Sequence, residues 1–384
     1  MHSTQFCSPN LSSYIHKQLA VVHNTERCIG LQIKMNSAQV QVVTANGHPE
    51  NVVTKQLERK GTARNVEWEG RGEIFEYVGA ANPAMSPIPV MGLRAVEHET
   101  GPTRVITLDA SKELEIEGYQ ASSPNLLASF LRICVGDSLT TSACATSQAF
   151  YVIHGRGRTS VEDQELEWKT GDLFVIPGGK EDTSCTHECF QDEKTGGAGL
   201  YWVSDSPLLA YLGVVPKGKK FDATFFSQEK LLESVDTVRH EPGAEHRNRL
   251  GILLGNVATP QTKTLTHTLW SLLNVLPAGS DIQRPHRHNS VALDLAIYAS
   301  PDSYTLMGRE LDGQGNVLNP VRVDWESGAM FVTPPGWWHS HHNDSGEDAW
   351  VLPLQDAGLY THQRTLDIRF SEQEIQLLDQ KIVR

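Results

Sequence analysis

The sequence of 384 residues lacks a hydrophobic run long enough to cross a membrane. No apolar stretch approaches the roughly 20 residues that span a bilayer. The N-terminal segment also lacks the basic region and apolar core of a secretory signal. We therefore expect a cytoplasmic protein with no membrane partner.

Cysteine and positive charge are also scarce. The six cysteines are dispersed and include no CxxC pair, which in a chain of this length predicts reduced thiols and no disulfide framework. The 33 Lys and Arg residues are outnumbered by 46 Asp and Glu residues, so the net charge is −13. An acidic protein repels phosphate, and we expect no nucleic-acid partner.

An internal repeat is the main feature that the sequence does contain. EWKTGDLFVIPGG (167–179) and DWESGAMFVTPPG (324–336) both run acidic–Trp–x–x–Gly–x–x–Phe–Val–x–Pro–x–Gly. Each copy is flanked by short strand-like runs that Gly and Pro separate, a texture typical of all-β barrels and sandwiches. The repeat therefore predicts two similar β domains in tandem.

The repeat divides the chain into four parts. In chain order we predict an N-terminal arm or accessory region, a first barrel, a linker with one amphipathic helix, and a second barrel, over residues 1–118, 119–215, 216–260 and 261–384. Within the arm, EIFEYVGA (73–80) has a strand-like alternation. The pattern at 370–382 predicts a short C-terminal helix with Ser371 as its N-cap.

The second copy carries two histidine motifs. The pattern G-x5-P-x-G-x2-H-x3-N is met by Gly328, Pro334, Gly336, His339 and Asn343. An H-x-H pair, His286 and His288, lies about fifty residues earlier in RPHRH. Together these motifs resemble those of the cupin superfamily, whose fold is a double-stranded β-helix (jelly-roll) barrel. With the repeat, the resemblance implies a bicupin over about residues 120–365.

The histidine spacing suits a metal ion. Residues two apart in a strand point to the same face, so His286 and His288 share one cavity. A third histidine from a distant strand, His339, completes the set. Three neutral imidazoles suit Fe(II), Mn, Ni, Cu or Zn and leave room for substrate and O2 or water. The alternative is a histidine-rich surface loop.

The absence of one glutamate indicates which branch of the superfamily this chain resembles. Many cupins carry a Glu four or five residues after H-x-H, where this chain has Ala292 and Leu293. The chain resembles instead the gentisate, salicylate and 1-hydroxy-2-naphthoate 1,2-dioxygenases. This resemblance implies Fe(II), an aromatic substrate that O2 opens, and a homo-oligomer, a dimer or tetramer. In those relatives the iron is described in the N-terminal barrel, so the present chain departs from them.

Residues around the histidines are candidates for the rest of the site. His341 lies two residues after His339 and is predicted as a catalytic proton carrier, whereas His342 should point away. One of the two tryptophans that follow the PPG turn is expected to wall the cavity. The candidate substrate-binding residues are Arg284, Arg287, Asp294, Arg309, Trp338 and Tyr304.

Asp294 is a second departure from the ring-cleaving relatives. They place an Arg six residues after H-x-H, where it holds the substrate carboxylate. An acidic residue there would repel an anion and could bind an amine or hydroxyl group. It could equally pair with Arg284, Arg287 or Arg309 as part of the structure, and these arginines could supply the carboxylate clamp.

The first copy is predicted to have lost its metal. The same register places Ser142 and Cys144 at the H-x-H positions and Asp182 at the third position. His154 and His187 lie nearby but out of register, and we expect both to be ordinary surface or core histidines.

Three functions are compatible with these observations. The leading prediction is an Fe(II)- and O2-dependent ring-cleaving, extradiol-type dioxygenase of a hydroxylated or amino-substituted aromatic compound. The alternatives are a metal-dependent lyase or isomerase of a small polar metabolite, and a ligand-binding bicupin without catalysis.

Overall fold

The computed structural model describes residues 35–36, 39–40, 68, 70–179, 182–191, 195–279 and 281–371. The chain forms two compact units, Met1–Asn82 and Pro83–Arg384. Within the described residues no helix is long and apolar enough to span a membrane.

The described part of the first unit is small. β1 (Met35–Asn36) pairs with β2 (Gln39–Val40), and α3 (Tyr77–Ala80) is a single helical turn. The strand-like interpretation of 73–80 was therefore wrong. The carboxylate of Glu76 accepts hydrogen bonds from the backbone N–H groups of Val78 and Gly79, which caps a helix at this point.

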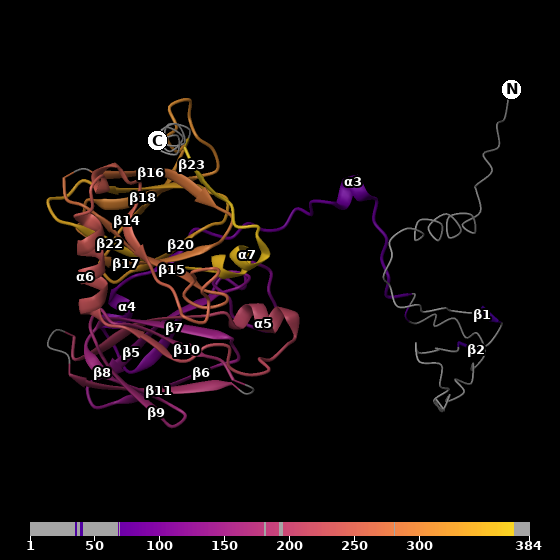
Figure 1. The fold of residues 1–384 in the computed structure, drawn as a ribbon, viewed down its shortest axis with the longest axis horizontal. Helices are drawn as coiled ribbons and strands as arrows, with labels where there is room; N and C mark the ends of the chain where they lie inside the picture. The colour runs from indigo at the N-terminus through magenta and orange to yellow at the C-terminus, as the bar shows by residue number, and fades with distance from the viewer. Residues whose placement is uncertain are drawn as a thin grey trace, which may run out of the picture. The chain divides into compact units, whose positions relative to one another are not determined.

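The second unit contains two stacked β barrels, drawn in magenta and orange in Figure 1. In the first barrel, one sheet has the order β13-β10-β7-β12-β5-β4. Its strands, in chain order, are β4 (Arg104–Leu108), β5 (Leu127–Cys134), β7 (Ser147–His154), β10 (Leu173–Pro177), β12 (Gly197–Ser204) and β13 (Thr224–Phe226). The facing sheet, β6-β11-β8-β9, is made of β6 (Ser138–Ala143), β8 (Arg156–Val161), β9 (Gln164–Lys169) and β11 (Thr183–Gln191).

The second barrel repeats this plan. Its six-stranded sheet, β14-β15-β22-β17-β20-β3, is made of β3 (Gly92–Leu93), β14 (Leu250–Leu253), β15 (Trp270–Leu276), β17 (Ala292–Tyr298), β20 (Met330–Thr333) and β22 (Ala349–Gln355). The facing sheet, β19-β18-β21-β16-β23, is made of β16 (Asp281–His288), β18 (Ser303–Gly308), β19 (Val321–Asp324), β21 (Trp338–Asn343) and β23 (Ile368–Phe370). The predicted all-β double barrel is confirmed.

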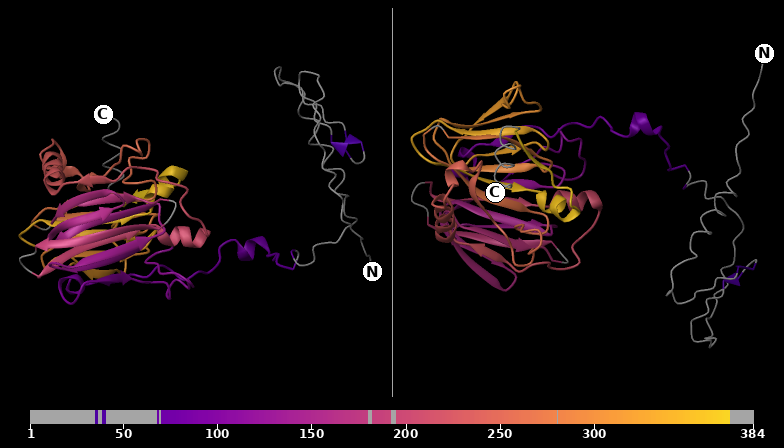
Figure 2. Two further views of the ribbon diagram at one scale, coloured as in Figure 1. Left: turned by 90° about the horizontal axis from the view of Figure 1, so that it is seen from below. Right: turned by 45° about the horizontal axis from the view of Figure 1, so that its top comes forward.

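The described helices of this unit lie at the edges and connections of the barrels. They are α4 (Val96–Glu99), α5 (Ser206–Leu212), α6 (Gln228–Arg239), η1 (Ala244–His246) and α7 (Ala357–Gln363). α5 and α7 follow equivalent strands, β12 and β22, and lie side by side in the views of Figures 1 and 2. α6 is the amphipathic helix expected in the linker. The helix predicted over 370–382 falls almost entirely on residues 372–384, outside the described residues.

The two six-stranded sheets pack against each other. One hydrophobic core draws buried side chains from both, including Phe130 and Tyr201 on one side and Leu293 and Leu352 on the other. The hydroxyl of Tyr201 donates a hydrogen bond to the carbonyl of Leu293 at 3.0 Å. The barrels therefore share a core, and β3, from the region before the first barrel, joins a sheet of the second.

Candidate metal centre

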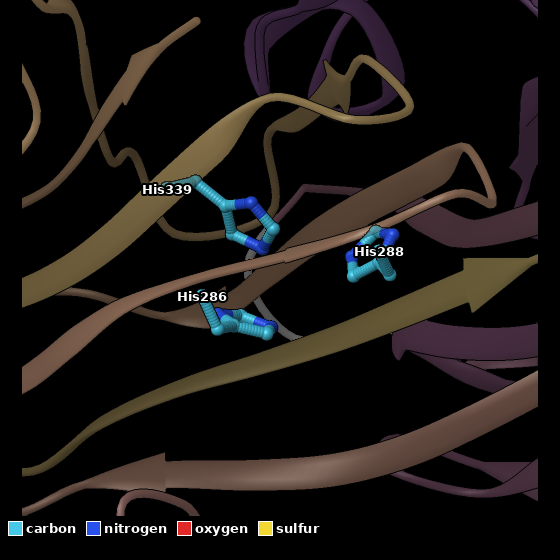
Figure 3. A group of neighbouring side chains, drawn as sticks. All are labelled: His286, His288 and His339. Carbon is cyan, nitrogen blue, oxygen red and sulfur yellow. The ribbon is translucent and has the colours of Figure 1, made fainter. Parts of the chain in front are cut away.

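Three histidines converge inside the second barrel (Figure 3). His286 and His288 lie on β16, and His339 lies opposite His286 on the neighbouring strand β21. The nitrogen atoms that they offer all lie within 4.8 Å of one another. His288 and His339 are buried, and His286 is partly buried. The structure thus brings together the three residues of the predicted ligand set.

A β-bulge in β16 helps to aim these side chains. Gln283 pairs with His341 and His286 pairs with His339, so β16 has one more residue than β21 between these pairs. Because residues three apart on a regular strand face opposite sides, the extra residue returns His286 to the barrel interior, where Gln283 is also buried.

Hydrogen bonds prepare two of the histidines to bind a metal through Nε2. The Nδ1 of His288 lies 2.8 Å from the carbonyl oxygen of Ser290, and the Nδ1 of His339 lies 3.0 Å from that of Trp337. A carbonyl accepts only, so each ring places its proton on Nδ1 and keeps a lone pair on Nε2.

Burial also keeps the rings neutral, as metal ligands must be. It lowers the pKa of His288 to about 4 and the pKa values of His286 and His339 well below the usual range. In all three cases desolvation is the largest cause, and the nearby guanidinium of Arg249 lowers the pKa further.

Arg249, which the sequence analysis missed, contacts the third histidine. It immediately precedes β14, and its guanidinium meets the Nδ1 of His286. A guanidinium only donates, so His286 accepts at Nδ1 and carries its proton on Nε2 in this arrangement. For His286 to bind a metal through Nε2, Arg249 must move away from Nδ1. Arg249 lies within the predicted linker, and no sequence motif marks it.

The histidines open into a cavity of about 230 Å³. Its walls are largely apolar and include Ile252, Trp270, Leu272, Val351, Pro353 and Phe370. Its polar residues are Arg249, Asn274, Asp294, Gln355 and the histidines, including His341. Pockets for drug-sized ligands span roughly 300–1,000 Å³, so this one suits a smaller molecule.

The other predicted substrate-binding residues do not line this cavity. Neighbouring residues of a strand face opposite sides, so Trp338 points away from the cavity that His339 faces. The guanidinium of Arg287 lies over the ring of Trp338, 5.2 Å from the ring centroid. Tyr304 stacks on His342 with ring centroids 4.7 Å apart. Arg284 and Arg309 are exposed, and Arg309 lies over the ring of Trp337. Of that group only Asp294 faces the cavity.

His341 is held by a chain of buried hydrogen bonds. The indole N–H of Trp325 donates to the hydroxyl of Thr305 at 2.8 Å. That hydroxyl lies 2.8 Å from the Nδ1 of His341 and has its own proton to donate there. This arrangement favours the tautomer of His341 with its proton on Nε2, which makes the ring a donor toward the cavity.

The first barrel contains the same chain without the metal ligands. Trp168 donates to Thr159 at 2.9 Å, and Thr159 lies 2.8 Å from the Nδ1 of His187. His187 therefore corresponds to His341. Its Nε2 lies 3.1 Å from the hydroxyl of Thr141.

This correspondence corrects the register that was assigned to the first copy. Cys185, two residues before His187, is buried and pairs with Thr141, just as His339 pairs with His286. Ser142 and Asp182, which were placed at ligand positions, are exposed. The error arose because Gly179 and His187 are eight residues apart, whereas Gly336 and His341 are five apart.

Aromatic rings fill the corresponding space of the first barrel. Phe150 stacks on Phe174 and on Trp202, with ring centroids 5.0 and 5.9 Å apart. Among the residues that the structure describes, only the second barrel gathers three side chains that could hold a metal ion.

Two double-stranded β-helix barrels in tandem define the bicupin fold. Comparison with solved structures agrees: salicylate 1,2-dioxygenase from Pseudoaminobacter salicylatoxidans, as a mutant in complex with gentisate, superposes with a TM-score of 0.59 and 14% identity over 83% of this chain and 98% of that chain. A structure of its gentisate adducts gives a TM-score of 0.59 and 14% identity over 86% and 97%. No family model and no curated sequence matches the chain. The chain thus has a bicupin fold that is similar to the fold of this dioxygenase.

Proposed function

We propose that the chain is an Fe(II)- and O2-dependent dioxygenase that cleaves the ring of a hydroxylated or amino-substituted aromatic compound. The observation that carries the proposal is the convergence of His286, His288 and His339 on a small apolar cavity. Apolar walls suit an aromatic ring, and three neutral imidazoles suit a ferrous ion. The resemblance in fold to salicylate 1,2-dioxygenase agrees with this proposal.

Each group in the cavity has a role in this proposal. His286, His288 and His339 would hold the iron, which supplies open positions for substrate and O2. The guanidinium of Arg249 offers a counter-charge for an anionic group of the substrate once it leaves His286. The Nε2–H of His341 donates to the bound molecule and can exchange a proton with it.

The first test is metal content. We expect protein purified without added metal to contain iron, and His339→Ala to lose it because the triad is broken. His342→Ala is the matched control, since His342 neighbours the triad on β21 but stacks outward on Tyr304. Retention of iron by His339→Ala would contradict the ligand assignment.

The second test is oxygen consumption. Iron-loaded protein should consume O2 with a subset of hydroxylated and amino-substituted benzoates and yield ring-opened products. Turnover without O2, or with Zn(II) in place of iron, would instead identify a lyase or isomerase that uses its metal as a Lewis acid.

A further inference from the structure

Asp294 is a buried acid inside the cavity whose hydrogen bonding is incomplete. It lies on β17, is 4% exposed and lines the same cavity as the histidines. Its Oδ2 accepts a hydrogen bond from the hydroxyl of Thr333 at 2.6 Å. Among the described residues no group donates a hydrogen bond to its Oδ1. A buried acceptor without a donor costs free energy, so its presence requires an explanation.

The first barrel shows that the fold does not need this acid. Phe331 and Phe174 are the same residue of the repeated motif. In the sheets, Asp294 pairs with Phe331 and Phe150 pairs with Phe174. Phe150 therefore occupies the place of Asp294 in the first barrel. By the same repeat, Ile176 occupies the place of Thr333.

Cavity polarity as a whole differs between the copies in the same way. Asn274 pairs with Val351 on β22, and its counterpart Leu131 pairs with Leu200 on β12. Leu131, Phe150 and Ile176 are all buried in the core of the first barrel. Polar side chains thus occupy these positions only where the histidine triad is present. The amide of Asn274 is paired with that of Gln283, whereas Asp294 accepts a hydrogen bond from Thr333 alone, which leaves the acid as the group that a ligand can engage.

Asp294 lies on the wall opposite the histidines. β17 belongs to the six-stranded sheet, and β16 and β21 belong to the facing sheet. A molecule that fills the small cavity between the sheets meets the histidines on one side and Asp294 on the other. Arg249, which contacts His286, attracts an anion at that site, whereas the acid on β17, when ionised, repels a second anion.

We infer that Asp294 selects a substrate with a hydrogen-bond-donating substituent, an amino or hydroxyl group, on the part of the ring away from the metal-binding group. This inference rests on the proposed function for the aromatic nature of the ligand. The substituent donates to the Oδ1 of Asp294, and Thr333 holds the carboxyl in place. The selected class is an aromatic monoacid with an amino or hydroxyl substituent, and a second carboxylate is rejected. Burial raises the pKa of Asp294 to about 7, although the hydrogen bond from Thr333 and the charge of Arg249 lower it, and a donor at Oδ1 would favour the ionised form further.

The test is ligand binding without oxygen to the iron-loaded protein. The probes are hydroxybenzoates that differ at a single ring position, which carries an amino, hydroxyl, methyl or carboxylate group. We expect the wild type to bind the amino and hydroxyl probes about tenfold or more tightly than the methyl probe, because the unpaired acceptor gains a donor. Asp294→Leu should abolish this preference and should bind the methyl probe at least as well as the wild type.

Two further variants complete the experiment. Asp294→Asn keeps an acceptor oxygen of similar shape and should retain part of the preference for the hydroxyl probe, so the result does not depend on the folding of the Leu variant alone. Asp182→Asn, an exposed acid of the first barrel, is the control and should leave every affinity unchanged.

The outcomes separate this inference from the proposed function. An unchanged preference in Asp294→Leu would overturn the inference even if the wild type consumes O2. A preference that depends on Asp294, in a protein that never consumes O2, would support the inference and contradict only the proposed reaction. Loss of iron in both Asp294 variants would assign the carboxylate to the metal and overturn a role in substrate selection.

Discussion

A tryptophan, a threonine and a histidine form the same series of hydrogen bonds in both barrels, but only the series in the second barrel ends at a cavity. In the first barrel the Nε2 of His187 meets the hydroxyl of Thr141, so that chain is part of the core. In the second barrel His341 faces the cavity beside the histidine triad. The Trp–Thr–His chain is therefore a property of the repeat, and the loss of the Thr contact at Nε2 makes His341 available to a ligand.

Replacing the central threonine in each barrel tests this distinction. Thr305→Val and Thr159→Val each remove the acceptor of a buried indole N–H, so each should lower the free energy of unfolding by roughly 1–3 kcal/mol. Only Thr305→Val also frees His341, and it alone should lower the rate of O2 consumption. Denaturant unfolding and an oxygen electrode measure the two effects. Equal loss of activity in both variants would refute the special position of His341.

Asp294 should make the stability of the metal-free protein depend on pH. Its pKa rises from 3.8 to about 7 on folding, with burial as the largest cause. Between these values the unfolded chain releases a proton that the folded chain keeps, so its contribution is most favourable below about pH 4 and declines until about pH 7. Asp294→Asn should remove this decline and gain up to roughly 4 kcal/mol relative to the wild type at neutral pH. Urea unfolding of both proteins from pH 4 to pH 8 measures it, and parallel curves would disprove the shift.

At the scale of elements, short strands from outside each barrel complete its sheets. β13 adds to β10 of the first barrel, and β3 adds to β20 of the second. The region predicted as an N-terminal arm, 1–118, thus contributes β3 and β4 to the two barrels, and the exact division of the chain stays a prediction. β20 also carries Thr333, so the attachment of β3 lies on the strand that holds the partner of Asp294.

Gly92 is the residue that allows β3 to approach. A Cβ atom at this position would collide with the backbone carbonyl of Met330. Gly92→Ala should therefore lower the free energy of unfolding by roughly 1–3 kcal/mol, the usual cost of overpacking. Gly346→Ala, where a Cβ meets open space, is the control. Thermal unfolding compares them, and equal melting temperatures would show that β3 contributes little to stability.

At the scale of the molecule, one core crosses the boundary between the barrels. Because the two six-stranded sheets bury their faces against each other, neither barrel can unfold without exposing the other. The first barrel, whose interior is filled by aromatic rings, therefore supports the sheet that carries Asp294 and Asn274.

A single cooperative transition should follow from this shared core. The tryptophan fluorescence of the wild type, to which Trp168 in the first barrel and Trp325 in the second both contribute, and its far-UV circular dichroism should report the same denaturation midpoint. Tyr201→Phe removes the hydrogen bond to Leu293 and should lower the free energy of unfolding by roughly 1 kcal/mol, which shifts both midpoints together. Two separate midpoints in the parent protein would show that the barrels unfold independently.

The sequence alone determined the repeat, the barrel class and the histidine triad. These features are local: the motif around His339 is contiguous, and the spacing of His286 and His288 reports their common face through strand alternation. The residues that line the cavity were predicted less completely. Arg249 lies in a segment without a sequence motif. Arg287, Arg309 and Tyr304 lie close to the histidine motifs in the sequence, but they do not line the cavity.

Only the tertiary structure decided which side chains meet in the cavity. The place of Arg249 depends on the pairing of β14 with β15, and that of Asp294 depends on two facing sheets. The correct register of the first copy needed the pairing of β11 with β6, because a loop of different length shifts His187 along the sequence. Strand pairing joins residues far apart in the chain, and a single sequence records no such pairing directly.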